Sequence, residues 1–145
     1  MIFVCAMTMA QTNAYPLLPM PQNYKVTDKS FAMGKVKLST PVLKSEWEAF
    51  IVNAGGELAD KAAAEIKIEL LPVIDGVKLN PDEAYRLSVS GKLIKIEAVT
   101  ERGVYWALQT LRQLEKKKGK KSLFAGCEIV DWPAFRIRGF MQDVG

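Results

Sequence analysis

Few residues of this 145-residue chain have the types and spacing that enzyme chemistry requires. The chain has no histidine, which excludes histidine acid–base catalysis, Ser-His and Cys-His nucleophile systems, and histidine metal sites. Asp82 and Glu83 form an acid pair, but adjacent side chains before a strand point in different directions, so we expect a solvated turn. The chain has no GxGxxG, Walker or HExxH motif, so nucleotide-binding and zinc-protease functions are not indicated.

Two other groups could bind a ligand. Tyr105 and Trp106 are adjacent in a predicted helix and could stack on a sugar ring, but we expect them in the core or at a domain interface, the commoner places for helical aromatic residues. The run KKKGKK, residues 116–121, could contact phosphates. It contains no aromatic residue and follows a helix end, where cations are favourable, so we expect a solvated loop. Without its five lysines the net charge of +4 becomes 4 − 5 = −1, so the basic charge is local.

The two cysteines predict no disulfide framework. Cys5 lies in residues 1–14, MIFVCAMTMAQTNA, an apolar run ending in small residues that is typical of a signal peptide. An ordinary N-terminal strand is the alternative, and the run is too short to span a membrane. We therefore expect a secreted or periplasmic protein whose mature chain keeps only Cys127, as a small hydrophobic residue on a strand.

The stretch Tyr85–Leu114 organises the predicted fold. Tyr85–Ser90 and Leu93–Val99 each alternate apolar and polar residues, which predicts two half-buried strands, and a Gly-Lys dipeptide between them predicts a hairpin turn. After the second strand the apolar residues change to helical spacing, with Thr100 placed to cap the helix. The apolar stripe of that helix consists of Val104, Ala107, Leu108, Leu111 and Leu114.

Further strands and another helix are predicted outside this stretch. Thr40 and the proline after it are typical of a helix start, and Gly55-Gly56 of a helix end, which predicts a helix over Pro41–Ala54. Alternation predicts a half-buried strand over Ala64–Leu71. Shorter strands are expected over Tyr24–Val26, Phe31–Leu38 and Glu128–Val130.

Three segments resemble the small α/β domain that precedes the catalytic barrel of family 20 glycoside hydrolases, the β-N-acetylhexosaminidases. They are PDEAYRLSVS, the helix TERGVYWALQTLRQL and the tail VDWPAFRIRGFMQDVG. The upstream LLPMPQNYKV is similar to the Pro-rich opening of that family. The resemblance covers most of Leu17–Gly145 and is weak between Lys35 and Asp75. Its most specific part is the tail, where an aspartate, a proline, an aromatic residue, Arg-Gly and a later Asp resemble the linker into the first barrel strand.

The resemblance implies an α+β fold of the zincin-like hexosaminidase N-terminal type. Together with the alternating segments it predicts a mostly antiparallel or mixed sheet of about five to seven strands with two helices on one face, the second over Glu101–Lys117. It divides the chain into residues 1–14 as a signal peptide remnant, 15–130 as the α/β domain, and 131–145 as the linker and first strand of a truncated catalytic barrel, with a new element over Phe135–Met141.

The resemblance also implies a parent enzyme, a glycosidase that removes terminal N-acetylhexosamine from glycans with the substrate's own 2-acetamido oxygen as nucleophile. Its Asp-Glu pair would lie in the barrel, where active sites occupy the C-terminal ends of the strands. We therefore predict no catalytic, substrate-binding or metal-ligating residue and no cofactor in this fragment, which should be inactive alone. Asp143 matches a family aspartate and is expected to be a structural carboxylate, and Arg138 is expected at the barrel floor or interface.

The partners implied are the chain's own barrel and, through it, a glycan substrate, with no nucleic acid and no membrane span. We expect the gene to continue past Gly145 with a sugar-binding arginine and, further on, the Asp-Glu pair. Two alternatives stay open. One is the N-terminal domain of an O-GlcNAcase-like hydrolase, which would continue from Arg-Gly towards a Glu-Gly-Phe-Tyr-Gly type segment, and the other is a stand-alone glycan-binding module.

Overall fold

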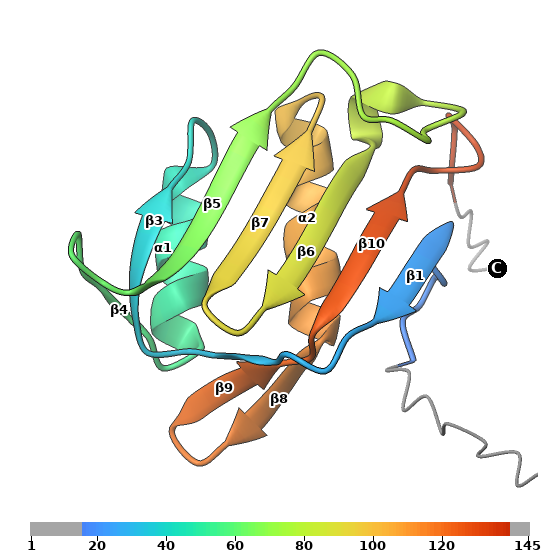
Figure 1. Cartoon of the computed structure of the whole chain (residues 1–145). Helices are drawn as coiled ribbons and strands as arrows, with labels where there is room; N and C mark the ends of the chain where they lie inside the picture. The colour runs from blue at the N-terminus through green and yellow to red at the C-terminus, as the bar shows by residue number, and fades with distance from the viewer. Residues whose placement is uncertain (1–15, 140–145) are drawn as a thin grey trace, which may run out of the picture.

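A mixed β-sheet with two helices on one face forms the body of the protein (Figure 1). The computed structural model describes residues 16–139. Its strands are β1 (Asn23–Val26), β2 (Phe31–Ala32), β3 (Lys35–Ser39), β4 (Glu57–Leu58), β5 (Ala64–Leu70), β6 (Tyr85–Ser90), β7 (Leu93–Ala98), β8 (Glu115–Lys118), β9 (Lys121–Phe124) and β10 (Cys127–Asp131). Its helices are α1 (Lys44–Asn53), α2 (Glu101–Gln113) and the short 3₁₀ helix η1 (Pro81–Glu83).

The large sheet has the order β1-β10-β6-β7-β5-β3-β4, and a small sheet has the order β2-β9-β8. β5 pairs in parallel with both β3 and β7, whereas β6 pairs antiparallel with both β7 and β10. Figure 1 places α1 and α2 together behind the large sheet. The predicted fold class, a mixed sheet of this size covered on one face by two helices, is therefore confirmed.

The hairpin at the centre of the sheet follows the predicted pattern. Leu87 lies opposite Ile96 and Val89 opposite Ile94, and all four side chains are buried under the helices. A two-residue turn joins Ser90 to its partner Leu93, as the Gly-Lys dipeptide predicts. The hairpin thus presents one continuous apolar surface to the helices.

Helix α2 also begins where predicted. The Thr100 side chain accepts a hydrogen bond from the backbone N–H of Arg102 at 3.1 Å and so caps the first turn. The predicted stripe is buried, since Val104, Ala107, Leu108, Leu111 and Leu114 are each at most 1% exposed. The helix ends at Gln113, four residues before the predicted end, because pairing with β9 begins at Glu115.

The start of α1 was predicted wrongly. Thr40 does not cap the helix: its Oγ1 donates to the carbonyl of Val42 at 2.6 Å, which closes a local turn. Leu43 then takes a left-handed backbone conformation with φ 53°, and the helix begins at Lys44. The predicted end is right, because Gly55 has φ 78° just beyond the helix.

The predicted strand over Phe31–Leu38 is two strands in different sheets. β2 pairs with β9 in the small sheet, and β3 pairs with β5 in the large one. Met33 lies between them, is 1% exposed, and its backbone N–H donates to the carbonyl of Ser122. The apolar positions change parity at this break, from Phe31 and Met33 to Val36, and a single strand cannot bury both sets on one face.

The lysine run is a β-hairpin, which corrects the prediction of a solvated loop. Lys117 lies opposite Ser122, and Lys118 opposite Lys121. The Lys117 ammonium donates to the carbonyl of Asn53 at 3.0 Å and forms an ion pair with Glu115 at 2.6 Å. These inward contacts, together with the buried Ser122, hold the hairpin against the end of α1 and fix its register.

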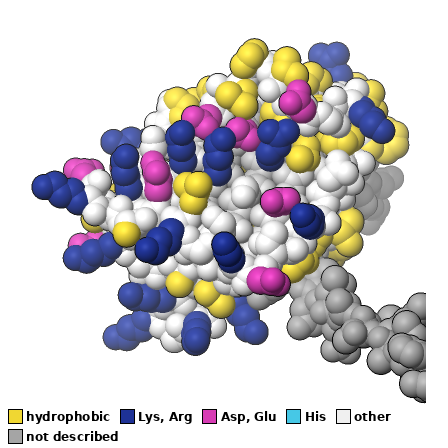
Figure 2. Space-filling view, in the orientation of Figure 1, with side chains coloured by type: hydrophobic (Ala, Val, Ile, Leu, Met, Phe, Trp, Pro, Cys, Tyr) yellow, Lys and Arg dark blue, Asp and Glu magenta, His cyan; other side chains and the backbone are white. Residues whose placement is uncertain are grey.

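The face of the large sheet opposite the helices is charged. Figure 2 shows basic and acidic side chains alternating across it. Lys95 forms ion pairs with Glu69 at 3.3 Å and with Glu97 at 2.6 Å, and Arg86 pairs with Glu97 at 3.1 Å. The hydrogen bond from Lys95 is the main cause that lowers the pKa of Glu97. This face is suited to water, so a packing partner would be expected elsewhere.

Several predictions concern segments outside the described residues. The signal peptide of residues 1–14 and the aspartate at position 143 fall outside them. Of the predicted element over Phe135–Met141, residues 135–139 are described and form no strand, while 140 and 141 are not described, so the barrel-entry assignment stays a prediction. Within residues 16–139, neither helix is long and apolar enough to cross a membrane.

Candidate functional site

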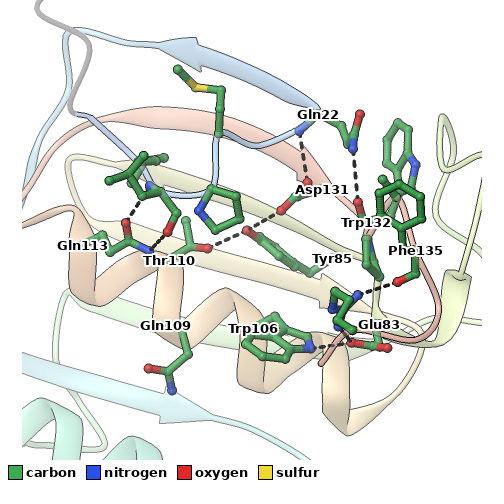
Figure 3. A pocket seen from close by; sticks show the side chains of 17 residues that line it. Gln22, Glu83, Tyr85, Trp106, Gln109, Thr110, Gln113, Asp131, Trp132 and Phe135 are labelled. Carbon is green, nitrogen blue, oxygen red and sulfur yellow. Dashed lines mark hydrogen bonds and ion pairs between the residues drawn. The ribbon is translucent and has the colours of Figure 1, made fainter. Parts of the chain in front are cut away.

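A groove of about 500 Å³ lies where the two ends of the described chain meet helix α2 (Figure 3). Its floor is the outer surface of α2 and Tyr85 at the start of β6. One wall is the segment before β1, and the other is the segment that follows β10. The residues that line it are Leu17, Leu18, Pro19, Met20, Gln22, Glu83, Tyr85, Trp106, Gln109, Thr110, Gln113, Asp131, Trp132, Pro133, Ala134, Phe135 and Arg138.

Two glutamines hold the first wall in place. Gln113 of α2 accepts from the backbone N–H of Leu18 at 2.9 Å and donates to the carbonyl of the same residue at 3.1 Å. Gln22 donates its backbone N–H to Asp131 Oδ1 at 3.0 Å and its side-chain amide to the carbonyl of Trp132 at 3.4 Å. The segment before β1 is therefore tied to residues about a hundred positions away.

The polar floor consists of a tyrosine, a threonine and an aspartate. The Tyr85 hydroxyl lies 2.6 Å from Thr110 Oγ1 and donates to Asp131 Oδ2 at 3.4 Å. Burial raises the pKa of Asp131 above its ordinary value, while the backbone N–H of Gln22 acts in the opposite direction. Burial likewise raises the pKa of the Tyr85 hydroxyl, which stays protonated at neutral pH.

Glu83 joins the second wall to helix α2. Its Oε2 accepts from the indole N–H of Trp106 at 2.8 Å and from the guanidinium of Arg138 at 2.5 Å. The same guanidinium lies 5.8 Å from the centre of the Trp106 ring and donates to the carbonyl of Phe135 at 2.9 Å. The prediction of a solvated turn is wrong for Glu83, whose side chain is only 13% exposed, because residues far along the chain cover it.

Apolar side chains stand exposed around the groove. They are Leu18, Met20, Tyr105, Trp106, Phe135 and Ile137, with exposed fractions between 40% and 91%. Tyr105 and Trp106 contact each other edge to face, with ring centroids 5.2 Å apart. Contiguous apolar surface with a polar rim marks interaction sites on soluble proteins. We call these six residues and the groove between them the α2 face.

The chemistry of the α2 face favours docking over catalysis. Glu83 and Asp131 already accept hydrogen bonds that join the two ends of the chain to the domain. These hydrogen bonds give both carboxylates a structural role, the joining of chain segments. Among residues 16–139, no three His, Cys, Asp or Glu side chains gather to hold a metal ion.

The structure gives each residue that the sequence singled out a definite place. Tyr105 and Trp106 are exposed at the surface, so the prediction that they lie in the core is wrong. The other predicted place, a domain interface, is compatible with this exposure. Arg138 lies over the ring of Trp106, where an interface residue is expected. Cys127 is fully buried on β10, as predicted, and burial raises the pKa of its thiol to about 12, so it is not a reactive nucleophile.

Sequence reasoning missed the residues that join the walls, above all Gln22, Gln113 and Tyr85. Their partners are 109, 95 and 46 positions away along the chain, respectively. The alternation that buries Tyr85 was visible, but no local pattern identifies a residue that forms a hydrogen bond with a distant segment.

Comparison with known proteins gives one consistent family. The model of glycosyl hydrolase family 20, domain 2, matches residues 14–132. A β-hexosaminidase from Vibrio furnissii is 36% identical over 84 residues, which are 58% of this chain and 13% of that protein. The structure of an inactive mutant of the GH20 exo-β-N-acetylglucosaminidase from Vibrio harveyi matches with a TM-score of 0.65 and 31% identity over 86% of this chain and 20% of that one.

A structure named CpGH84B matches with a TM-score of 0.66 but only 20% identity, over 86% of this chain and 24% of that one, and so shows the fold alone. The chain spans about an eighth of the length of the Vibrio furnissii relative and a fifth of the Vibrio harveyi structure. Between the two hydrolase families considered from the sequence, the family match favours family 20 over the O-GlcNAcase-like alternative.

Proposed function

Since this chain belongs to glycosyl hydrolase family 20, as the region described as its domain 2, we propose that it is the non-catalytic domain of a β-N-acetylhexosaminidase and docks on the catalytic barrel. The observation that carries this proposal is the family match over residues 14–132. The relatives named as a β-hexosaminidase and an exo-β-N-acetylglucosaminidase support the substrate class, terminal N-acetylhexosamine on a glycan. Their greater length supports a separate catalytic region in the complete protein.

The α2 face is the surface that we assign to the barrel. It carries six exposed apolar residues, whereas the opposite sheet face is covered with ion pairs. Arg138 and Glu83 hold the segment after β10 across Trp106, so the chain leaves the domain on this side. A domain joined by a short connection at an apolar surface loses little entropy when it docks there. The domain's role would then be to support the barrel and to bury the α2 face.

We also propose that the protein is secreted or periplasmic. The support is the apolar segment over residues 1–14, which ends in small residues as signal peptides do. Mass spectrometry of the protein exported by its native host tests this, and a mature chain that still begins at Met1 would contradict it.

The first expected result concerns catalysis. The purified 145-residue chain should not hydrolyse an aryl N-acetylglucosaminide, because the acid pair of the proposed mechanism lies outside it. The protein encoded by the complete native gene should hydrolyse the same substrate and serves as the control. Turnover by the chain at a rate similar to that of the complete protein would contradict the proposal. A complete protein with no activity on any N-acetylhexosaminide would leave a glycan-binding module as the better function.

The second expected result concerns docking. Phe135→Ser should lower the free energy of unfolding of the complete protein by about 1.5–3 kcal/mol, the value of burying an aromatic side chain. The same change should alter the free energy of unfolding of the isolated chain by less than about 0.5 kcal/mol, because Phe135 is 73% exposed there. Val73→Ser changes a similarly exposed apolar residue (67%) outside the groove and should leave the stability of both proteins unchanged. Equal effects of Phe135→Ser in both proteins would show that the α2 face is not the docking surface.

A further inference from the structure

The hairpin of β8 and β9 has one side fixed to the domain and one side open to solvent. On the fixed side Ser122 and Phe124 are buried and Lys117 contacts the end of α1. Residues two apart on a strand, and residues directly opposite across a pair, share a face. The register therefore places Lys116, Lys118 and Lys121 together on the open side, and Lys120 is exposed in the turn beside them. Figure 2 shows basic side chains gathered at this end of the molecule.

These four lysines differ from several basic residues elsewhere on the surface, which are paired with an acidic side chain. Lys25, Lys35, Lys37 and Lys44 each lie within 4.0 Å of a glutamate carboxylate. In residues 16–139, no acidic side chain lies at ion-pair distance from Lys116, Lys118, Lys120 or Lys121. We call these four lysines the hairpin cluster.

The register itself is unfavourable for the isolated domain. Lys118 lies directly opposite Lys121, and like charges at such positions destabilise a strand pair. Lys116 and Lys118 are about 7 Å apart along the strand, from the usual rise per residue, so their charges also repel. An anion placed over the open side would remove this repulsion, and a chain with regularly spaced anions would meet several lysines at once.

We propose that the hairpin cluster binds an acidic polysaccharide, a linear glycan that carries sulfate or carboxylate groups. The choice of a glycan rests on the proposed function, which places the protein on carbohydrate. Lysine provides flexible point charges with three donors each, which suit anions at variable positions, whereas the planar fork of arginine suits one fixed geometry. The open side carries no aromatic side chain for stacking, which single-stranded nucleic acid requires. The cluster would hold the enzyme on a charged glycan surface, apart from the α2 face.

A pair of matched variants tests this proposal. In the first, the four lysines of the hairpin cluster are changed to glutamine, and in the second, Lys25, Lys35, Lys37 and Lys44 are changed to glutamine. Both variants carry the same net charge, 4 − 4 = 0. The probe is a fluorescent sulfated oligosaccharide derived from heparin, and its affinity for the 145-residue chain is measured by anisotropy. Binding does not depend on hydrolysis, so a negative result here leaves the proposed catalytic function untouched.

The unchanged chain should bind the probe at low salt and release it in about 1 M salt, where charges are screened over about 3 Å. The first variant should lose about tenfold or more in affinity, and the second should stay within about twofold. Circular dichroism should show both variants folded, with the unfolding midpoint of the first not lowered. An equal loss of affinity for the probe in both variants, or no loss of affinity in the first variant, would overturn the proposal. Tighter binding to single-stranded DNA or to vesicles of anionic lipid than to the sulfated probe would also overturn it.

Discussion

Replacing Leu108 by alanine is expected to lower the free energy of unfolding by about 2–5 kcal/mol. Leu108 is 1% exposed in the middle of the α2 stripe and belongs to the core that both helices form with the large sheet. The substitution removes buried methyl groups and leaves a cavity that the neighbouring strands cannot fill without moving. Equilibrium unfolding in urea, followed by circular dichroism, measures the loss.

Leu79→Ala is the matched control for this change. It removes the same atoms from a leucine that is 54% exposed in the connection before η1. Substitutions at such positions usually change stability by less than about 0.5 kcal/mol. If the two variants unfolded at the same urea concentration, Leu108 would not be part of the core and the orientation of α2 would be wrong.

Replacing Gly55 by alanine is expected to cost about 2–5 kcal/mol, for two separate reasons. Gly55 has φ 78°, and a left-handed conformation costs other residues about 1–2 kcal/mol. A Cβ atom there would also lie 2.0 Å from the carbonyl oxygen of Lys120, which the hairpin turn holds against the end of α1. Relieving that contact requires a backbone shift, and overpacking of this kind costs about 1–3 kcal/mol.

Gly76→Ala separates the two reasons. Gly76 has φ 89°, and nothing lies within 4 Å of the Cβ that an alanine would add. This control should therefore show the conformational cost alone, about 1–2 kcal/mol. Thermal unfolding of both variants checks the difference. Equal losses would mean that the hairpin does not pack against Gly55 as described.

Part of the fold could be predicted because it depends on local periodicity. The alternation of β5, β6 and β7 and the helical spacing in α2 each show which side of an element is apolar, and burial of that side decides its orientation. The cap at Thr100 and the helix end at Gly55 also depend on the local backbone, and both were predicted correctly. The first turn of α1 was not, because the Thr40 hydroxyl closes a turn before the helix begins.

The candidate site was less predictable. The sequence drew attention to Trp106 and Arg138, and the structure brings them together. It gave no sign that Glu83 joins them, since an acidic residue in a turn is usually solvated. The Gln113 contact to Leu18 depends on a segment 95 residues away. Local patterns carry no information about such pairs, so only the folded chain identifies them.

By itself, the sequence determined which faces of β5, β6, β7 and α2 are buried, the α+β class and the family resemblance, because these depend on residue type and on short-range spacing. Only the tertiary structure decided which strands are neighbours outside the β6–β7 hairpin, that β2 and β3 pair in different sheets, and that the lysine run is a hairpin. The physical reason is that strand pairing satisfies backbone hydrogen bonds between distant segments. Many partners are locally equivalent for one strand, and the choice among them follows from burying all the apolar faces together.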